Sequence, residues 1–393
     1  MDYNKYVNTT AAGIKPSGIR KFFDISDTME GVISLGVGEP DFRTPWHIRN
    51  AGISSLENGQ TRYTSNWGME ALRTEICRFM KRKYNLSYDP HDEVLVTVGG
   101  SEAIDIAVRT IIRPGDEVLI PQPSFVCYEP IVQLAGGTPV IIELKDEDNF
   151  VLKPEQIKEK VTEKTKAIVL PYPCNPTGAI MTTEDLLAIK DVIIKNDLLI
   201  ISDEIYAELT FGEHRHVSVA EIEGLSERTI LVSGFSKTYS MTGWRLGFAC
   251  GPAPLLALMT KLHQYAIMCA PTTAQYAAIE ALKNGDDDVA EMREQYNQRR
   301  RYLLHAFAEM GLPCFEPDGA FYVFPCIKEF GMTSDEFATR FLQEEKVAVV
   351  PGTAFGDSGE GYIRISYAYS LENLKVAIGR LSHFVKKLKA EKE

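Results

Sequence analysis

Between about Glu93 and Gly251 the chain alternates between apolar runs and amphipathic stretches, and this alternation restricts the possible fold more than any other feature. The apolar runs are rich in β-branched residues, which favour strands: EVLVTVG, DEVLIPQ, TPVIIEL, KAIVLPYP, DLLIISDE, RTILVSG and GFACG. Apolar residues at helical spacing separate many of them, for example over residues 101–112 and 183–195. This order predicts a mostly parallel sheet, buried on both faces, with helices on either side.

The pattern changes near Asp286, where DDDVAEMREQYNQRRRYLLHAFAEM predicts a long polar helix. Short predicted strands in GAFYVFP, VAVVP and YIRISYA and a final helix follow, so we predict a second, smaller α+β unit. The predicted spans are 1–46 for the N-terminal segment of the small domain, 47–285 for the large domain and 286–393 for the C-terminal small domain. An eight-fold βα barrel also alternates strand and helix, but the change near Asp286 counts against it.

The composition argues against several functional classes. The 393 residues carry 42 Lys plus Arg and 54 Asp plus Glu, a formal net charge of -12 with neutral histidines. Because Lys and Arg provide the first attraction to nucleic acid and to anionic membranes, we expect neither as a partner. No secretory signal or membrane span is evident, so we expect a cytoplasmic protein. Scattered cysteines without a C-x-x-C pair, and the isolated pair His214 and His216, predict no metal site.

The most informative stretch for chemistry is SGFSKTYSMTGWRLG, residues 233–247, in which Lys237 follows a predicted strand. Ligands of open α/β sheets bind at the carboxyl ends of strands, and a lysine kept from water there has a lowered pKa suited to Schiff-base chemistry. Ser236 adds a hydroxyl, and Arg245 adds a guanidinium group for an anion such as phosphate. Taken alone, Lys237 would be a solvated surface lysine, so this interpretation depends on its setting.

This stretch resembles the signature around the cofactor lysine of class I and II aminotransferases, which are pyridoxal phosphate enzymes of fold type I. The match includes Gly234 three residues before Lys237, Ser236 just before it and Arg245 eight residues after it. The resemblance continues in family order through GVGEPDF, RYTSNWG, VTVGGSEAI, PYPCNPTG, SDEIY, GAFYVFP and RISYA. It implies a large domain with a seven-stranded, mostly parallel sheet, a smaller α+β domain from both ends of the chain, and pyridoxal 5'-phosphate as cofactor.

The resemblance further implies a homodimer with shared active sites that moves the amino group of an α-amino acid to a 2-oxo acid, with 2-oxoglutarate expected, in a ping-pong cycle. In motif the chain is closest to broad-specificity and aromatic prokaryotic aminotransferases. A C–S β-lyase of the same fold is the alternative. A nicotinamide dehydrogenase is disfavoured because GVGEPD lacks the third glycine of the dinucleotide fingerprint. A ligand-sensing regulator would need a DNA-binding domain for which the chain has no spare length.

In SDEIY, Asp203 ends a predicted strand and Tyr206 follows it closely, so both side chains can face one crevice if a helical turn follows. Without other signals, a helix N-cap and a core tyrosine would be the simpler interpretation. A carboxylate against the cofactor's ring nitrogen keeps that nitrogen protonated, because an opposite charge in contact shifts a pKa by about 1–3 units. The resemblance gives this role to Asp203 and gives Tyr206 a hydrogen bond to the cofactor's phenolic oxygen.

The other site residues are implied mainly by their positions in the family motifs. Gly100 and Ser101 open a predicted helix whose N–H groups suit a phosphate, and Arg364 is expected to clamp the substrate α-carboxylate. Tyr63 is expected to reach the phosphate of the neighbouring subunit. The predicted catalytic residues are Lys237, Asp203 and Tyr206; the cofactor would bind Tyr63, Gly100, Ser101, Glu102, Phe125, Asn175, Asp203, Tyr206, Ser236, Lys237 and Arg245; the substrate would bind Gly38, Asn175 and Arg364.

Two positions depart from the family pattern. Many relatives have serine in place of Gly234, so one phosphate contact is missing or is supplied by Ser236. The bacterial aspartate-specific branch has lysine in place of Ser101 and uses it for the distal carboxylate of the substrate. We therefore expect broad specificity, with apolar or aromatic donors at least as good as aspartate, helped by apolar surface from Phe22, Phe23 and Phe125. The segment IRKFFD, with Arg20, is expected to close over the site.

Overall fold

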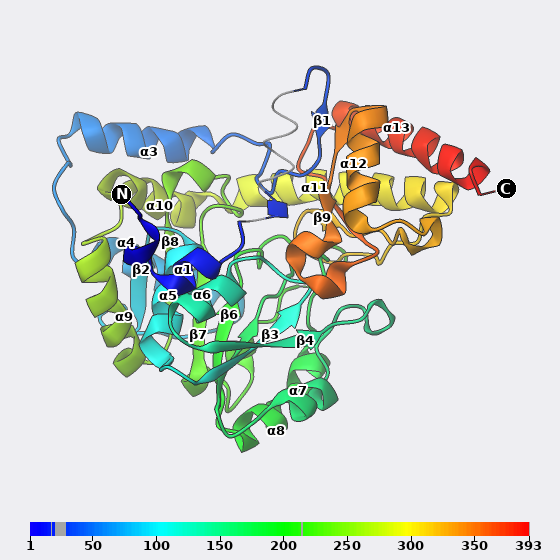
Figure 1. The fold of residues 1–393 in the computed structure, drawn as a ribbon. Helices are drawn as coiled ribbons and strands as arrows, with labels where there is room; N and C mark the ends of the chain where they lie inside the picture. Colours follow the sequence, from blue (N-terminus) through cyan, green and yellow to red (C-terminus); the bar gives the residue numbers. More distant parts are fainter. Residues whose placement is uncertain (17, 20–28, 214, 393) are drawn as a thin grey trace.

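A seven-stranded sheet forms the centre of the computed structural model, which describes residues 1–16, 18–19, 29–213 and 215–392 (Figure 1). The strand order is β2-β8-β7-β6-β5-β3-β4, with β2 Val94–Thr97, β3 Glu117–Gln122, β4 Thr138–Glu143, β5 Thr165–Leu170, β6 Leu199–Asp203, β7 Thr229–Gly234 and β8 Gly247–Cys250. Neighbouring strands are parallel, except that β8 is antiparallel to β2 and β7. The predicted mostly parallel α/β sheet is confirmed, and because the sheet is open the barrel alternative is wrong.

Helices cover both faces of this sheet, because successive residues of a strand point to opposite faces. In β5, Ala167 and Val169 pack with the layer formed by α5 (Gly100–Ile111), α6 (Tyr128–Leu134) and α9 (Ala253–Ala266). Ile168 and Leu170 pack on the other face with α7 (Pro154–Lys160) and α8 (Thr183–Lys195). Further along that face lie α4 (Glu70–Tyr84) and α10 (Thr272–Asn284), and α3 (Trp46–Glu57) packs along α10.

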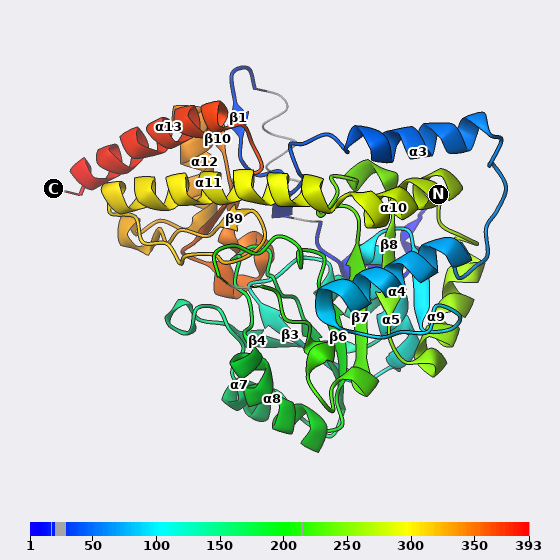
Figure 2. The same cartoon turned by 180° about the vertical axis from the view of Figure 1, so that it is seen from behind.

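A second unit contains a three-stranded antiparallel sheet in which β12 (Ile363–Ser366) lies between β11 (Val350–Pro351) and β9 (Tyr322–Val323). Its helices are α11 (Asp286–Met310), α12 (Ser334–Glu345) and α13 (Leu371–Ala390). Figure 2 shows α11 as one long helix running from beside α10 to α13. The α+β pattern expected after Asp286 therefore appears as its sequence indicates.

The N-terminal residues divide between the two units. Strand β1 (Ile33–Ser34) pairs in parallel with β10 (Val347–Ala348), whereas α1 (Thr9–Gly13) contacts α6 beside the large sheet. The domain boundaries at residues 46 and 285 stay a prediction. Within the described part of the chain, no helix is long and apolar enough to cross a membrane. The location in the cytoplasm also stays a prediction.

Candidate active site

One cavity of about 300 Å³ lies where the segments after β5, β6 and β7 meet the second unit. This is the side of an open α/β sheet on which ligands bind, and the volume suits a small ligand. The cavity brings together all of the predicted site residues except Glu102 and Tyr63. It is lined by Gly38, Gly100, Ser101, Phe125, Asn175, Asp203, Tyr206, Ser236, Lys237, Arg245 and Arg364.

Lys237 follows β7 in the turn that leads back to β8, and its amine is enclosed by protein although the residue as a whole is only partly buried. Its Nζ donates a hydrogen bond to the Gly38 carbonyl oxygen. Burial lowers the pKa of Lys237 to about 8; the Glu39 carboxylate opposes this effect, and the nearby cations Arg364 and Arg245 add to it. A larger share of Lys237 is therefore a neutral, nucleophilic amine near neutral pH than of an exposed lysine.

Asp203 is held in a fixed orientation at the end of β6. Its Oδ2 accepts a hydrogen bond of 2.7 Å from the Tyr128 hydroxyl, and its Oδ1 accepts one of 3.2 Å from the Ile205 N–H. Burial raises the pKa of Asp203, while the two hydrogen bonds favour the ionised form. Sequence reasoning missed Tyr128, although its position at the start of α6, shortly after Phe125, was a usable signal.

Tyr206 also lines the cavity, and its hydroxyl lies 2.8 Å from that of Tyr322, a second residue missed by sequence reasoning. Tyr322 comes from β9 in the motif GAFYVFP, whose alternation suggested a strand but gave no function to the tyrosine. A Cβ atom at Gly38 would lie 2.6 Å from the Tyr322 hydroxyl, so the absence of a side chain at Gly38 allows this tyrosine to approach. The two tyrosines thus connect the segment after β6 with the second unit.

Arg364 is 1% exposed and points from the central strand β12 into the cavity. Its Nη1 donates to Asn175 Oδ1 at 2.8 Å, and its Nη2 donates to the Gly36 carbonyl oxygen. Its guanidinium carbon lies 4.4 Å from the ring centroid of Tyr322, which orients the planar group. Arg364 Nε is buried and has no hydrogen-bond partner among the described residues. A buried cation with an unused donor fits a carboxylate ligand.

The opposite end of the cavity suits a phosphate. Helix α5 begins at Gly100, so its first N–H groups lack partners within the helix and attract anions. A Cβ at Gly99 would lie 2.9 Å from Arg245 Nη2, which places the guanidinium group of Arg245 against this helix start. Ser236 lines the same cavity. Backbone donors, a hydroxyl and a cation therefore surround one anion site.

The structure explains why this chain has glycine at position 234. A Cβ there would lie 3.0 Å from the Gly247 Cα and 3.1 Å from the Leu246 carbonyl oxygen, so the serine found in many relatives would be crowded. The close approach comes from the pairing of β7 with β8, in which Gly234 faces Gly247. Ser236 lines the cavity, as does Ser101, so the replacement of the missing contact by the Ser236 hydroxyl stays a prediction.

Two predicted cofactor residues lie outside the cavity lining. The Glu102 carboxylate accepts a hydrogen bond from the Val98 N–H and lies 2.7 Å from His263 Nδ1, so the predicted role of this side chain in binding cofactor is not supported. Tyr63 is 82% exposed on the surface. The segment IRKFFD spans residues 19–24, and its residues 20–24, with Arg20, Phe22 and Phe23, lie outside the described residues. Its first residue, Ile19, lines the cavity.

These residues fit pyridoxal phosphate: the site combines an enclosed amine for its aldehyde, a buried carboxylate for its ring nitrogen, a tyrosine for its phenolic oxygen and an anion site for its phosphate. Arg364 lines the same cavity and has an unused donor, which suits an amino acid carboxylate. Among the described residues, no group of three or more His, Cys, Asp or Glu could hold a metal ion.

Comparison with known proteins decides the family. The model of the family "Aminotransferase class I and II" matches residues 30–381. The chain belongs to this family. It is 52% identical to "Putative aminotransferase YugH" of Bacillus subtilis, over 97% of this chain and 99% of that protein. It is 46% identical to the aspartate aminotransferase of Pyrococcus abyssi, over 96% and 97%. The crystal structure of an aromatic aminotransferase from Pyrococcus horikoshii superposes with a TM-score of 0.90 at 44% identity, over 94% of this chain and 99% of that chain.

This aminotransferase is therefore a pyridoxal phosphate-dependent enzyme of fold type I that transfers an amino group from an amino acid to a 2-oxo acid. The predicted family, fold class and cofactor are confirmed. The named relatives favour amino-group transfer over the C–S lyase alternative.

The lowered pKa of Lys237 gives a prediction for the cofactor-free aminotransferase. Only the neutral amine can attack an aldehyde, so the rate constant for covalent capture of saturating pyridoxal phosphate should increase with pH, with a midpoint near the pKa of about 8. Stopped-flow absorbance across a pH series measures this rate constant. The Lys237→Ala variant corrects for capture by other lysines. A midpoint near the ordinary lysine value of 10.5 would contradict the burial argument.

Proposed function

We propose that the enzyme transfers the amino group of apolar and aromatic amino acids to 2-oxoglutarate in a ping-pong cycle, with Lys237, Asp203, Tyr206 and Arg364 as its principal active-site residues. The observation that carries this proposal is that the Lys237 amine, the Asp203 carboxylate and the Arg364 guanidinium group line one cavity. When bound, pyridoxal phosphate supplies an electron sink that stabilises negative charge at the substrate Cα. The chain supplies binding, orientation and proton transfer.

In this proposal Arg364 and Asn175 bind the substrate α-carboxylate and so fix the position of its Cα. Gly38 lines the same cavity, and its carbonyl oxygen accepts a hydrogen bond from Lys237 Nζ. The amine of Lys237 would remove the proton from the substrate Cα and hold it for return to the bound cofactor. Asp203 keeps the ring nitrogen protonated. Tyr206, restrained by Tyr322, donates a hydrogen bond to the phenolic oxygen.

We propose that the cofactor's phosphate would be held by Gly100, Ser101, Ser236 and Arg245. Phe125 is proposed to pack on the cofactor ring, because its side chain lines the cavity and meets Tyr128 edge-on at a centroid distance of 6.2 Å. Tyr128 in turn binds Asp203. Tyr128 therefore contacts both Phe125, proposed to pack on the cofactor ring, and Asp203, proposed to bind the ring nitrogen.

The preference for apolar donors rests on the charges available in the cavity. Among the described lining residues the cations are Lys237, Arg245 and Arg364, and each has a role in the mechanism above. Ser101 stands where the aspartate-specific branch has lysine, and Ile19, Ile104 and Phe125 add apolar surface. Burying an apolar or aromatic side chain contributes roughly 1.5–3 kcal/mol. The relatives carry both aspartate and aromatic names, so their names alone do not decide between the two.

For donor specificity, we expect phenylalanine and tyrosine to have kcat/KM values at least equal to that of aspartate, with 2-oxoglutarate as acceptor. Steady-state assays with phenylalanine, tyrosine, leucine, alanine and aspartate measure this. Ser101→Lys should raise kcat/KM for aspartate relative to phenylalanine, because it adds a cation for the distal carboxylate. An aspartate preference above about 100-fold in the parent, near 2.7 kcal/mol in transition-state binding, would show that another cation serves that carboxylate.

We also propose a homodimer with shared active sites. Tyr63 and several neighbouring apolar residues are exposed, including Tyr265 (88%) and Met268 (45%). The segment that carries Tyr63 contacts the segment that carries Tyr265 and Met268, because Asn66 Nδ2 donates a hydrogen bond to the Met268 carbonyl oxygen at 2.8 Å. Such a surface fits a second copy of this chain, whose phosphate site the Tyr63 hydroxyl would complete.

Light scattering is expected to give the mass of a dimer, and a fully active monomer would contradict the proposal. A sharper measurement mixes two impaired variants, Lys237→Ala and Tyr63→Ala, after reversible dissociation. In a mixed dimer the subunit with intact Lys237 receives Tyr63 from its partner, so activity should be regained. No gain on mixing, with mixed dimers present, would argue against shared sites.

A further inference from the structure

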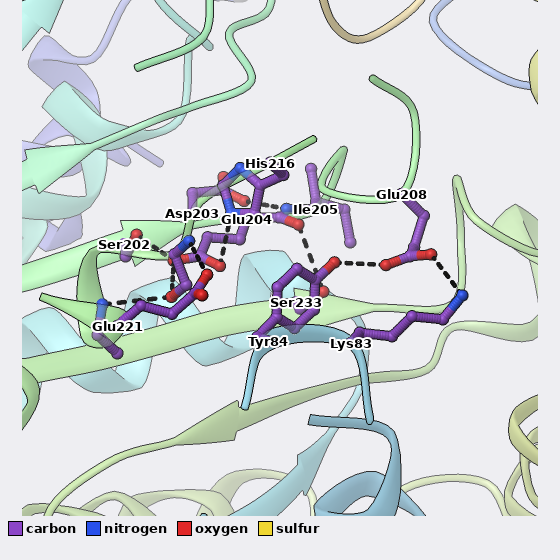
Figure 3. A network of polar contacts seen from close by, with 12 residues as sticks. Lys83, Tyr84, Ser202, Asp203, Glu204, Ile205, Glu208, His216, Glu221 and Ser233 are labelled. Atoms are coloured by element: carbon purple, nitrogen blue, oxygen red, sulfur yellow. Dashed lines mark hydrogen bonds and ion pairs between the residues drawn. The ribbon is translucent and has the colours of Figure 1, made fainter. Parts of the chain in front are cut away.

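A cluster of buried polar side chains lies behind the active-site end of β6 (Figure 3). Its centre is the carboxylate of Glu204, which directly follows Asp203 and is 1% exposed. Because successive residues of an extended chain point to opposite sides, Ser202 and Glu204 share one side and Asp203 takes the other. Asp203 lines the cavity, whereas Glu204 does not. The mechanism proposed above gives Glu204 no task.

Three side chains donate hydrogen bonds to Glu204. The hydroxyls of Ser202 and Ser218 donate to Oε1 at 2.8 and 2.7 Å, and His216 Nε2 donates to Oε2 at 2.8 Å. His216 is 5% exposed and is the basic group that faces this carboxylate. A buried carboxylate is tolerated only when hydrogen bonds and an opposite charge or dipole compensate its lost hydration. His214, which the sequence paired with His216, lies outside the described residues.

The cluster continues toward the surface through α4. The Tyr84 ring meets the His216 ring edge-on, with centroids 5.8 Å apart, and the Tyr84 hydroxyl donates to Glu208. Glu208 pairs with Lys83 at 3.3 Å (Figure 3). The titratable groups that interact with Glu204 are Asp203, Tyr84, Tyr88 and Cys250, and Tyr84 also faces His216. Glu208 acts on Tyr84.

The backbone next to Glu204 is fixed by the neighbouring strand. The Glu204 N–H donates to the Val232 carbonyl oxygen of β7 at 2.8 Å, and the Ser233 hydroxyl donates to the Glu204 carbonyl oxygen at 3.4 Å. The next N–H, that of Ile205, is the one that binds Asp203 Oδ1. Any movement of Glu204 would therefore move a donor that orients Asp203.

We propose that Glu204 and His216 are positioning residues for Asp203. The hydrogen bond between Glu204 and His216 fixes the end of β6 on the side opposite the cavity, so that the Asp203 carboxylate stays directed at the ring nitrogen of the cofactor. The Glu204 carboxylate adds a second negative charge next to Asp203. This inference rests on the role proposed above for Asp203. The Glu204 charge acts on Asp203 in the same direction as burial, since both raise the pKa of Asp203.

The test uses the holoenzyme and two readouts. The first is the pH at which the absorbance band of the bound cofactor shifts, and the second is kcat compared with KM. Glu204→Gln keeps the shape of the side chain but removes its negative charge. The protonated form of the bound cofactor then loses electrostatic stabilisation, so the midpoint of its absorbance titration should move to lower pH. We expect kcat to fall about tenfold, the equivalent of one pKa unit. KM should change little, because Arg364 and Asn175 lie on other elements.

Further variants separate positioning from simple loss of packing. His216→Gln keeps an N–H donor for Glu204 and should retain more activity than His216→Ala. Ser202→Ala removes only one of the three donors to Glu204 and should lower kcat several-fold. This variant tests the positioning role if Glu204→Gln gives too little folded protein. The control is His47→Gln, which makes the same substitution at another histidine, one whose imidazole contacts Glu280 at 2.8 Å and Asp288 at 2.9 Å away from the cavity.

An unchanged midpoint and parental kcat in Glu204→Gln would overturn the inference. It would also fail if His47→Gln caused the same losses, because the effects would then reflect stability alone. The Asp203→Asn variant separates this inference from the proposed function. A strong effect at Asp203 without any at Glu204 removes only the positioning role, whereas no effect at Asp203 removes both.

Discussion

Replacing Lys237 with alanine is expected to abolish transamination, with kcat reduced by at least the ~10²–10⁴ that a proton-transfer group typically contributes. The Lys237 amine is the only lysine amine among the described residues that line the cavity. Steady-state assays with phenylalanine and 2-oxoglutarate measure the loss. Circular dichroism and the content of bound pyridoxal phosphate show whether the fold and the anion site persist.

Two matched variants make this result specific. Lys237→Arg retains a cation, but a guanidinium group cannot be deprotonated in a protein, so the variant should be as inactive as Lys237→Ala. Lys375→Ala removes an exposed lysine on α13 and should leave activity at the parental level. Turnover of Lys237→Ala within about tenfold of the parent would refute the assignment.

The variant Asp203→Asn should retain its fold and its cofactor but lose roughly 10–10³ in the rate of each half-reaction, because contact with an opposite charge is worth about 1–3 pKa units. The structure allows the substitution: the amide oxygen can accept from the Ile205 N–H, and the amide nitrogen can donate to the Tyr128 oxygen. The ring nitrogen of the cofactor then faces a neutral group. Single-turnover absorbance with amino acid, and separately with 2-oxo acid, measures both rates.

Tyr128→Phe is the companion variant for Asp203. It removes one of the two hydrogen bonds to the carboxylate and keeps the charge, so we expect a loss smaller than that of Asp203→Asn. Unchanged half-reaction rates in Asp203→Asn, at full cofactor content, would show that another group keeps the ring nitrogen protonated.

The elements of the large sheet could be predicted because each is encoded locally. The strand around Ile168 and the helix over residues 183–195 follow from short apolar patterns, and the structure places both as expected. The antiparallel direction of β8 is also understandable afterwards. The twelve residues 235–246 that separate it from β7 contain no α-helix, whereas a parallel connection usually runs through a crossover helix.

Contacts between distant parts of the chain could not be predicted in the same way. Tyr128 and Tyr322 carry no local signal for a site, since aromatic residues in apolar runs are usually core residues. Their roles depend on where β9 and α6 lie relative to Asp203 and Tyr206, and that information is in the packing. Glu102 shows the complementary difficulty, because its position in the motif does not tell which way its side chain points, and its carboxylate contacts Val98 and His263. The role predicted for Tyr63 in the neighbouring subunit stays a prediction.

The insertion of β8 between β2 and β7 has a consequence for biosynthesis. Chains emerge at about 5–20 residues per second, so β2 at Val94–Thr97 waits roughly 8–30 s for its partner at Gly247–Cys250. During that interval the edge of β2 that will face β8 has unpaired N–H and C=O groups, a known route to aggregation. The contact of Arg364 with the Gly36 carbonyl, 328 residues away, forms later still. Recombinant yield should therefore depend on translation speed and chaperone supply more than the stability of the finished enzyme suggests.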